Sequence, residues 1–190
     1  MAIEIEKKYR LSTTRMDEVA AKLESLGAVF SSEVFEENYL HRGGVLDERG
    51  AVLRLRKIGD LTLMTYKEKL RNASDVKHNI EFETVVGDVD AMESIIEKLG
   101  YHLSLIYEKH RRTWHFLDVE VVLDELPFGL FMEIEGTIEH IAEAEILLDI
   151  KDLEPESRGY PRLTVKYGEM VGDVAEARFR PNLRAQNRMS

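Results

Sequence analysis

The spacing Glu-x-Glu occurs three times in this chain, each time inside a short segment that is typical of a β-strand. The pairs are Glu4/Glu6, Glu81/Glu83 and Glu133/Glu135. Successive side chains of a strand point to opposite faces, so each pair places two carboxylates on one face and apolar neighbours on the other. These segments therefore predict strands with one charged face and one apolar face.

Basic residues show the same two-residue spacing in other strand-like segments. The basic pairs are Arg54/Arg56, Lys67/Lys69 and Lys109/Arg111. Lys8 shares the face of the first acidic pair, and Asp124 shares a face with Glu120. Two interpretations remain open: these are ordinary solvated faces of amphipathic strands, or they line one shared charged cavity.

The order of strand-like and helix-like segments predicts a single domain over residues 1–170. Strands are expected at 3–11, 34–41, 51–58, 61–69, 77–86, 105–117, 118–125 and 130–136. Helices are expected over 137–150, after Pro161, from Ser12 or Thr14 to Gly27, and from Asp88 to Gly100. The strand number and hairpin-like spacings predict an α+β fold with a mostly antiparallel, closed sheet.

The apolar stripes of the helices need a surface on which to pack. If they pack on the apolar faces of the strands, the charged faces point away from the helices, which in a barrel means into the lumen. A lumen that holds both signs of charge suits a polyphosphate with a metal ion. Hard divalent cations prefer carboxylate oxygens, and Arg and Lys bind phosphate oxygens.

Composition excludes several classes of function. The formal net charge of −10 argues against nonspecific nucleic-acid binding, and no apolar run approaches the roughly 18 residues of a membrane helix. The chain has no cysteine, which excludes disulfides, thiolate metal sites and a cysteine nucleophile. Because the N-terminus begins with a strand-like segment and not with a signal peptide, a cytoplasmic location is expected.

The ordered series of charged residues resembles the CYTH superfamily, also called triphosphate tunnel metalloenzymes. Glu4, Glu6 and Lys8 match its N-terminal signature ExExK. Further matches, in order, are Arg54, Arg56, Lys67, Glu81, Glu83, Lys109, Arg111, Asp124, Gly129, Glu133 and Glu135. The resemblance spans residues 3 to about 168. It implies a closed eight-stranded antiparallel β-barrel around a tunnel, with helices packed outside.

The resemblance also implies the roles of the charged residues. The expected triphosphate-binding residues are Lys8, Arg54, Arg56, Lys67, Lys69, Lys109 and Arg111. The expected ligands of one or two Mg²⁺ or Mn²⁺ ions are Glu4, Glu6, Glu81, Glu83, Asp124, Glu133 and Glu135. The expected catalytic set is Glu4, Glu6, Lys8, Lys67 and Arg111.

The leading hypothesis is metal-dependent hydrolysis of inorganic tripolyphosphate or of a small organic triphosphate. The alternatives are a class IV adenylyl cyclase, which converts ATP to cyclic AMP and pyrophosphate, and a noncatalytic module that binds polyphosphate or nucleotide. The expected partner is thus a small-molecule triphosphate and not a nucleic acid or a membrane. The sequence leaves open whether the chain forms a homodimer.

Residues outside these motifs receive simpler interpretations. Tyr160 is expected in the core, with a place near a tunnel mouth as the alternative, and a tunnel position for His115 is a secondary possibility. Residues 171–190 are expected to form a polar, mobile tail. Its arginines are expected in solvent, with cover of one tunnel entrance as the alternative; they are Arg178, Arg180, Arg184 and Arg188.

Overall fold

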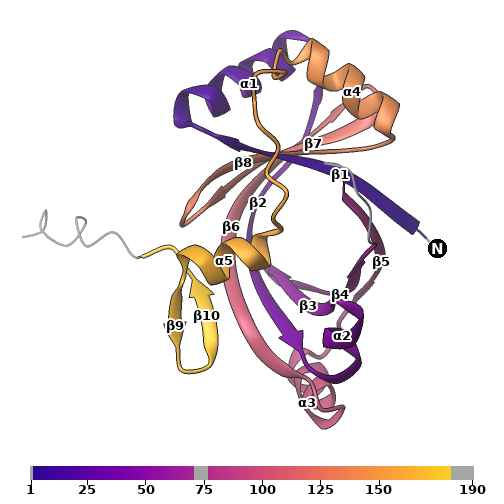
Figure 1. The fold of residues 1–190 in the computed structure, drawn as a ribbon, viewed down its shortest axis with the longest axis vertical. Coiled ribbons are helices and arrows are strands. Elements are labelled where there is room, and N and C mark those ends of the chain that lie inside the picture. The colour runs from indigo at the N-terminus through magenta and orange to yellow at the C-terminus, as the bar shows by residue number, and fades with distance from the viewer. Residues whose placement is uncertain (1, 71–76, 181–190) are drawn as a thin grey trace, which may run out of the picture.

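Eight strands close into an antiparallel β-barrel in the computed structural model, which describes residues 2–70 and 77–180 of the 190-residue chain (Figure 1). Around the barrel the order is β2-β3-β4-β5-β1-β8-β7-β6, and β6 returns to β2. The bounds are β1 Ala2–Leu11, β2 Val29–Arg42, β3 Ala51–Ile58, β4 Leu61–Lys69, β5 Lys77–Val85, β6 His102–Phe116, β7 Val119–Leu126 and β8 Gly129–Glu135. The expected α+β barrel is confirmed, although β2 and β6 begin earlier than the sequence indicates.

Two long-range pairings close the ring. β1 pairs with β5 through residues 2–6 and with β8 through residues 6–11, so its two halves belong to different neighbours. β2 and β6 pair along most of their length, with irregularities between Phe30 and Ser32 and between Leu40 and His41. Such bulges bend a strand and increase its twist, which helps a sheet to close on itself.

Three of the helices begin where the sequence places side-chain caps. The bounds are α1 Thr13–Ser25, α2 Gly44–Arg49, α3 Val89–Lys98, α4 Ile138–Leu147 and α5 Tyr160–Tyr167. The side chains of Ser12, Asp88 and Thr137 each accept a hydrogen bond from a backbone N–H of the first turn of α1, α3 and α4. The short helix α2 was not expected, because Gly43 and Gly44 indicate only a turn.

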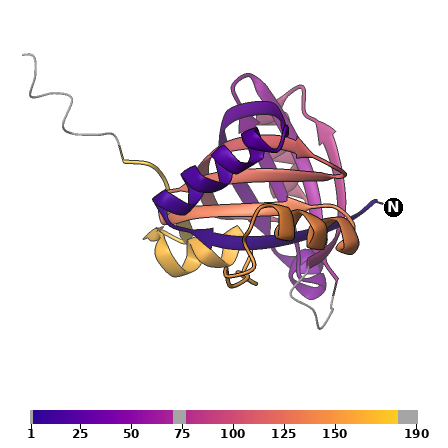
Figure 2. The ribbon, with the colours of Figure 1, turned by 90° about the horizontal axis from the view of Figure 1, so that it is seen from above.

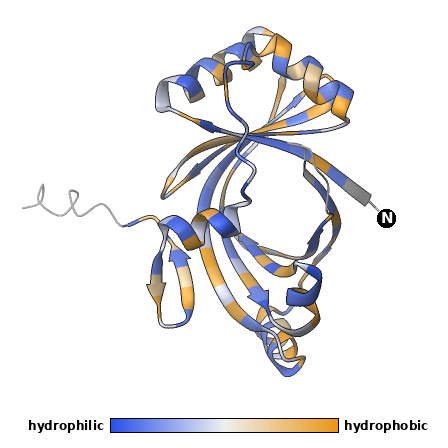
Figure 3. Cartoon of the chain, in the orientation of Figure 1, coloured by the Kyte–Doolittle hydropathy of each residue, from blue (hydrophilic) through white to orange (hydrophobic). Residues whose placement is uncertain are grey.

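The helices pack on the outer faces of the strands. α1 and α4 lie together over β1, β7 and β8, as Figures 1 and 2 show, with Leu23 and Ile141 among the fully buried side chains. Ile96 of α3 packs with Leu55 of β3 in a second outer core. Hydrophobic and hydrophilic residues alternate along the strands in Figure 3. The apolar residues pack under the helices outside the barrel, and the charged residues are left to face the inside. None of the helices in the described ranges has the length and apolar character needed to cross a membrane.

The C-terminal segment corrects the expectation of a tail that starts at residue 171. Strands β9 (Glu169–Val171) and β10 (Val174–Ala177) form a hairpin, and β10 pairs in parallel with β6. Ala175 and Ala177 are buried against this strand. The edge of β6 supplies the hydrogen bonds and apolar surface that so short a segment lacks alone. The expected tail residues Arg184 and Arg188 lie outside the described residues.

Candidate active site

The charged faces of the strands meet in two adjoining chambers inside the barrel. The first, here called the cationic chamber, has a volume of about 110 Å³. It is lined by Lys8, Arg54, Arg56, Lys67, Lys109 and Arg111, together with Glu4, Glu6, Glu81, Glu133, Leu40, Val52, Tyr107, Gly159, Tyr160 and Pro161. The second, here called the acidic chamber, has a volume of about 30 Å³. It is lined by Glu4, Glu6, Glu120, Glu133, Glu135, Arg111 and Val122. The alternation therefore describes a charged lumen and not a set of solvated outer faces.

Lys67 is the common partner of three carboxylates. Its Nζ lies 3.0 Å from Glu81 and 3.8 Å from Glu6, and it also contacts Glu4. Burial disfavours the charged lysine, but these carboxylates outweigh it and raise the pKa of Lys67. One cation does not neutralise three acids. Burial, with repulsion from Glu6 and Glu81, raises the pKa of Glu4 to about 8 despite the attraction of Lys67.

Arg111 joins the two chambers. Its Nε and Nη2 donate to the two oxygens of Asp124 at 2.7 and 2.6 Å, and Nη2 also donates to Glu133 at 2.7 Å. The other oxygen of Glu133 lies 3.0 Å from Nζ of Lys8. The four side chains come from β6, β7, β8 and β1, so the barrel's register brings them together.

Glu36 of β2 is a site residue that the sequence reasoning missed. Its side chain is 1% exposed and lies 3.3 Å from Lys109 and 3.8 Å from Arg56. Burial alone would raise the pKa of Glu36, but Lys109 and the neighbouring arginines outweigh burial and lower it. Glu36 and the buried Asn38 repeat the two-residue polar spacing, which was the available signal.

Three predicted residues line neither chamber. Lys69 is exposed near the end of β4. Glu83 accepts a hydrogen bond from Thr65 at 2.7 Å and lies 3.7 Å from Arg54. Asp124 is fully buried behind Arg111. Of the weaker candidates, Tyr160 lines the cationic chamber, whereas His115 is exposed and lines neither one.

The acidic chamber has the kind of donors that Mg²⁺ or Mn²⁺ prefers, because it presents several carboxylates and no nitrogen or sulfur ligand. Burial and the neighbouring Glu120 raise the pKa of Glu135 to about 7, although the charge of Lys67 opposes them. Within the described residues, no three acidic or histidine side chains are already gathered around one point. The donor set thus fits a divalent ion in kind. Glu4 contacts Lys67, and Glu133 contacts Lys8 and Arg111, so an ion bound by these carboxylates would compete with those cations.

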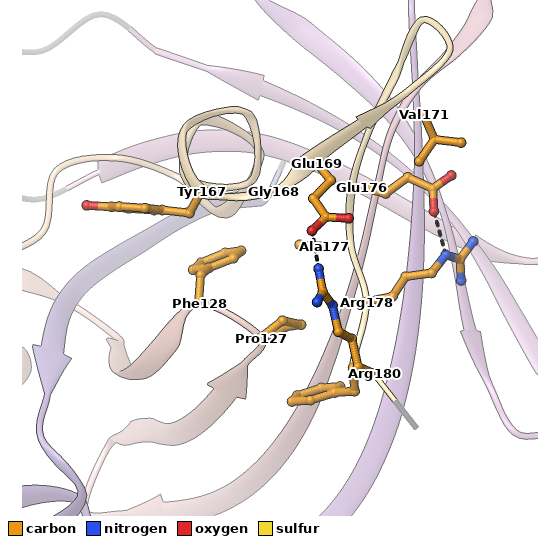
Figure 4. A pocket seen from close by; sticks show the side chains of 11 residues that line it. Pro127, Phe128, Tyr167, Gly168, Glu169, Val171, Glu176, Ala177, Arg178 and Arg180 are labelled. Carbon is orange, nitrogen blue, oxygen red and sulfur yellow. Dashed lines mark hydrogen bonds and ion pairs between the residues drawn. The ribbon is translucent and has the colours of Figure 1, made fainter. Parts of the chain in front are cut away.

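A larger hollow, of about 670 Å³, lies outside the barrel between the β7–β8 turn, the end of α5 and the β9–β10 hairpin (Figure 4). Phe128 and Tyr167 stack there with ring centroids 6.0 Å apart. Its charged side chains pair with each other, Arg178 with Glu176 at 2.8 Å and Arg180 with Glu169. No residue of the predicted site lines it, so we place the candidate active site in the barrel and not here.

A closed antiparallel barrel with cations and carboxylates in one lumen defines a tunnel protein suited to polyanions. The chain belongs to the CYTH domain family, whose model matches residues 2–160. It is 29% identical over 151 residues to a Methanocaldococcus jannaschii protein named "Putative adenylate cyclase", an alignment that covers 77% of this chain and 84% of that protein.

Solved structures show the same fold. The PH1012 protein of Pyrococcus horikoshii is 25% identical with a TM-score of 0.73, and the match covers 84% of this chain and 98% of that one. HpAC1 from Hippeastrum, a "putative adenylyl cyclase" with a dominant triphosphatase activity, is 16% identical with a TM-score of 0.66, covering 90% of this chain and 98% of that one. At that identity the likeness establishes the fold alone.

Proposed function

We propose that this chain is a divalent-metal-dependent triphosphatase that hydrolyses tripolyphosphate or a small organic triphosphate inside the barrel. The observation that carries the proposal is the adjoining position of the two chambers. Six cationic side chains line one chamber, and five carboxylates line the other. Glu4, Glu6, Arg111 and Glu133 line both, but Glu120 and Glu135 line only the second. A triphosphate needs many phosphate-binding cations together with a metal site at the reacting phosphate, and this lumen offers both.

The cations would hold the phosphate chain. Arg54 and Arg56 can bind phosphate oxygens with two N–H groups each, and Lys8 and Lys109 act as point charges. Without substrate these cations are paired with carboxylates, which keeps them charged and oriented. The phosphate oxygens would replace part of those contacts, so the site requires little rearrangement of the backbone.

Hydrolysis would take place where the chambers meet. The chain's best ion ligands are Glu4, Glu6, Glu133 and Glu135, and a bound Mg²⁺ or Mn²⁺ would supply charge neutralisation and help to orient or activate water. Water oxygen attacks the terminal phosphorus, the bond to the bridging oxygen breaks, and orthophosphate and pyrophosphate leave when the substrate is tripolyphosphate. Arg111 would stabilise charge on the transferred group, since positioning and electrostatics supply most of the rate in phosphoryl transfer.

One observation favours an organic triphosphate and keeps the adenylyl cyclase as the second candidate. A mainly apolar hollow of about 270 Å³ adjoins the cationic chamber and shares Leu40, Val52 and Pro161 with it. This hollow gives room for a group attached to the phosphate chain. In a cyclase that group would be the nucleoside of ATP, whose 3′-hydroxyl attacks the α-phosphate and expels pyrophosphate.

Product analysis tests these candidates. Purified protein with Mg²⁺ or Mn²⁺ is given tripolyphosphate, ATP or thiamine triphosphate, and orthophosphate and cyclic AMP are measured together. Orthophosphate release that stops on chelation supports the proposal. Cyclic AMP with pyrophosphate would replace it with the cyclase, and tight binding without either product would favour the noncatalytic module.

Substitution of Glu133 tests the site itself. We expect Glu133→Gln to lower kcat/KM by at least about tenfold, because it removes the charge of a carboxylate that lines both chambers. The matched control is Glu125→Gln, which makes the same change on an exposed residue of β7 that lines neither chamber. Equal activity of the two variants would contradict the proposed location.

A further inference from the structure

Tyr160 occupies an unexpected place for a residue expected in the core. It is the first residue of α5, it is 5% exposed, and it lines the cationic chamber. Its hydroxyl donates a hydrogen bond of 2.7 Å to Oδ2 of Asp124. That oxygen also accepts from Nη2 of Arg111 at 2.6 Å and lies 3.6 Å from Nζ of Lys109.

Asp124 therefore fixes the position of the Arg111 guanidinium. The carboxylate is fully buried and holds the guanidinium through two parallel hydrogen bonds, the arrangement that fixes both position and plane. A carboxylate in a strand keeps some freedom to rotate about its side-chain bonds. The phenol of Tyr160 restricts that freedom, because it binds the same oxygen from the side of the helix.

The ring of Tyr160 holds a second cation. Nζ of Lys8 lies 3.3 Å from the ring centroid, and the lysine is 2% exposed. A desolvated ammonium over an aromatic face is attracted to the ring's negative face. Lys8 also pairs with Glu133, so the ring and the carboxylate fix it from two directions.

Tyr160 is itself held firmly. Its ring packs on Phe131 and Tyr107 with centroids 5.4 and 6.0 Å apart. The fully buried Thr164, one turn later in α5, donates from Oγ1 to the carbonyl oxygen of Tyr160 at 2.9 Å. A residue fixed by its own helix and by β6 and β8 can set the position of groups that bind it.

We propose that Tyr160 is a positioning residue of the phosphate-binding site, which aligns Arg111 through Asp124 and seats Lys8 on its ring. This inference rests on the proposed function, because it assigns to Arg111 and Lys8 the task of binding the phosphates. It makes α5 a part of the site and not only a cover over the outer core.

The test compares two buried tyrosines that each donate to a carboxylate. Tyr160→Phe removes the hydroxyl that binds Asp124, and Tyr9→Phe removes the hydroxyl that binds Glu145 in the outer core. Tripolyphosphate hydrolysis, tripolyphosphate binding and thermal unfolding are measured for both. We expect Tyr160→Phe to lower kcat/KM by about tenfold to 100-fold, the range that a small misplacement of a catalytic group produces. Tyr9→Phe is expected to leave kcat/KM unchanged, while both variants lose a comparable amount of thermal stability.

A double-substitution cycle separates positioning from general weakening. If Tyr160 acts through Arg111, the Tyr160→Phe change has little effect on kcat/KM when Arg111 is already lysine, because the two-bond contact with Asp124 is gone. Independent, multiplicative effects of Tyr160→Phe and Arg111→Lys would overturn the inference. So would a Tyr160→Phe variant whose activity equals that of Tyr9→Phe.

The failure of this inference and the failure of the proposed function are distinguishable. An active unsubstituted chain with an unaffected Tyr160→Phe variant removes the inference and leaves the function standing. An unsubstituted chain that binds tripolyphosphate but hydrolyses neither it nor ATP nor thiamine triphosphate removes the function. Weaker tripolyphosphate binding by Tyr160→Phe than by Tyr9→Phe would then still support the positioning role. A chain that neither binds nor hydrolyses tripolyphosphate, ATP or thiamine triphosphate removes both.

Discussion

At the scale of single residues, the lumen depends on shared partners and not on isolated ion pairs. Glu4, Glu6 and Glu81 share Lys67, and Asp124 and Glu133 share Arg111. Each cation keeps several acids from repelling one another, and each acid keeps a cation in place for a ligand. Removing one member of a buried pair costs more than the pair contributes, because the remaining charge stays out of water.

This arrangement predicts that Lys67→Met lowers the free energy of unfolding at pH 8 by roughly 2 kcal/mol, a value below the range for fully buried pairs because a quarter of the lysine side chain is exposed. The loss should be smaller at pH 5, where the three carboxylates can take up protons. Urea unfolding at both pH values measures it. Lys57→Met is the control, since Lys57 pairs with one partly exposed acid, Glu93, at 3.7 Å. An equal effect of the two substitutions at pH 8 would contradict the shared role of Lys67.

At the scale of elements, the register of each strand decides which of its alternating side chains face the lumen. A slip of one residue in β1 would turn Glu4, Glu6 and Lys8 outward and bring Tyr9 into the lumen. The apolar positions of β1 pack beneath α1 and α4, which fixes the register and with it the charged face. Strand β10 obeys the same rule, since Ala175 and Ala177 share a buried face and Val174 and Glu176 on the other face are less buried. Met170, in the outer strand β9, is exposed.

The hairpin therefore gives a matched pair of substitutions. Ala175→Asp should lower the free energy of unfolding by about 2–4 kcal/mol, because it buries a carboxylate without a partner. Met170→Asp places the same group in solvent and should change it by no more than about 0.5 kcal/mol. Denaturant unfolding of both variants measures the difference. Equal effects would mean that the hairpin does not pack on β6.

At the scale of the whole molecule, packing and chemistry occupy opposite sides of one sheet. The helices bury the apolar faces outside, so the lumen can hold charges whose burial opposes folding. The raised pKa values of Glu4 and Glu135 express this cost. The effect is weaker for Glu135, whose side chain keeps more contact with solvent.

The molecule should therefore lose stability as the pH rises when no metal ion is present. The pKa values of Glu4 and Glu135, about 8 and about 7, lie above the ordinary 4.5, so the folded chain binds more protons than the unfolded chain between about pH 5 and pH 8. Over that window, stability falls as these protons leave. A divalent ion binds the deprotonated carboxylates, so the rise in Tm caused by Mg²⁺ or Mn²⁺ should be larger at pH 8.5 than at pH 6.

Thermal unfolding in chelator and in excess metal, at both pH values, checks this. Glu135→Gln should retain a smaller part of the pH dependence, and Glu125→Gln should retain all of it. A metal-induced rise in Tm that is equal at the two pH values would contradict the assignment of these carboxylates as ion ligands.

Much of this architecture could be predicted because strand alternation is a local property. The pairs of inward charges in β1, β3, β6 and β8 can be recognised from their two-residue spacing, and the helix caps Ser12, Asp88 and Thr137 mark helix starts without tertiary information. The hairpin β9–β10 could not be predicted in this way. Its strands have three and four residues, and the edge of β6 stabilises them only in the folded chain.

The sequence by itself determined which residues can share a charged face, since the two-residue period follows from the backbone alone. Only the tertiary structure decided which charges meet. The closure of β2 on β6 places Glu36 beside Lys109, and the packing of α5 on the barrel places Tyr160 beside Asp124. These contacts join segments many residues apart, and their register depends on packing between elements, which no local pattern encodes.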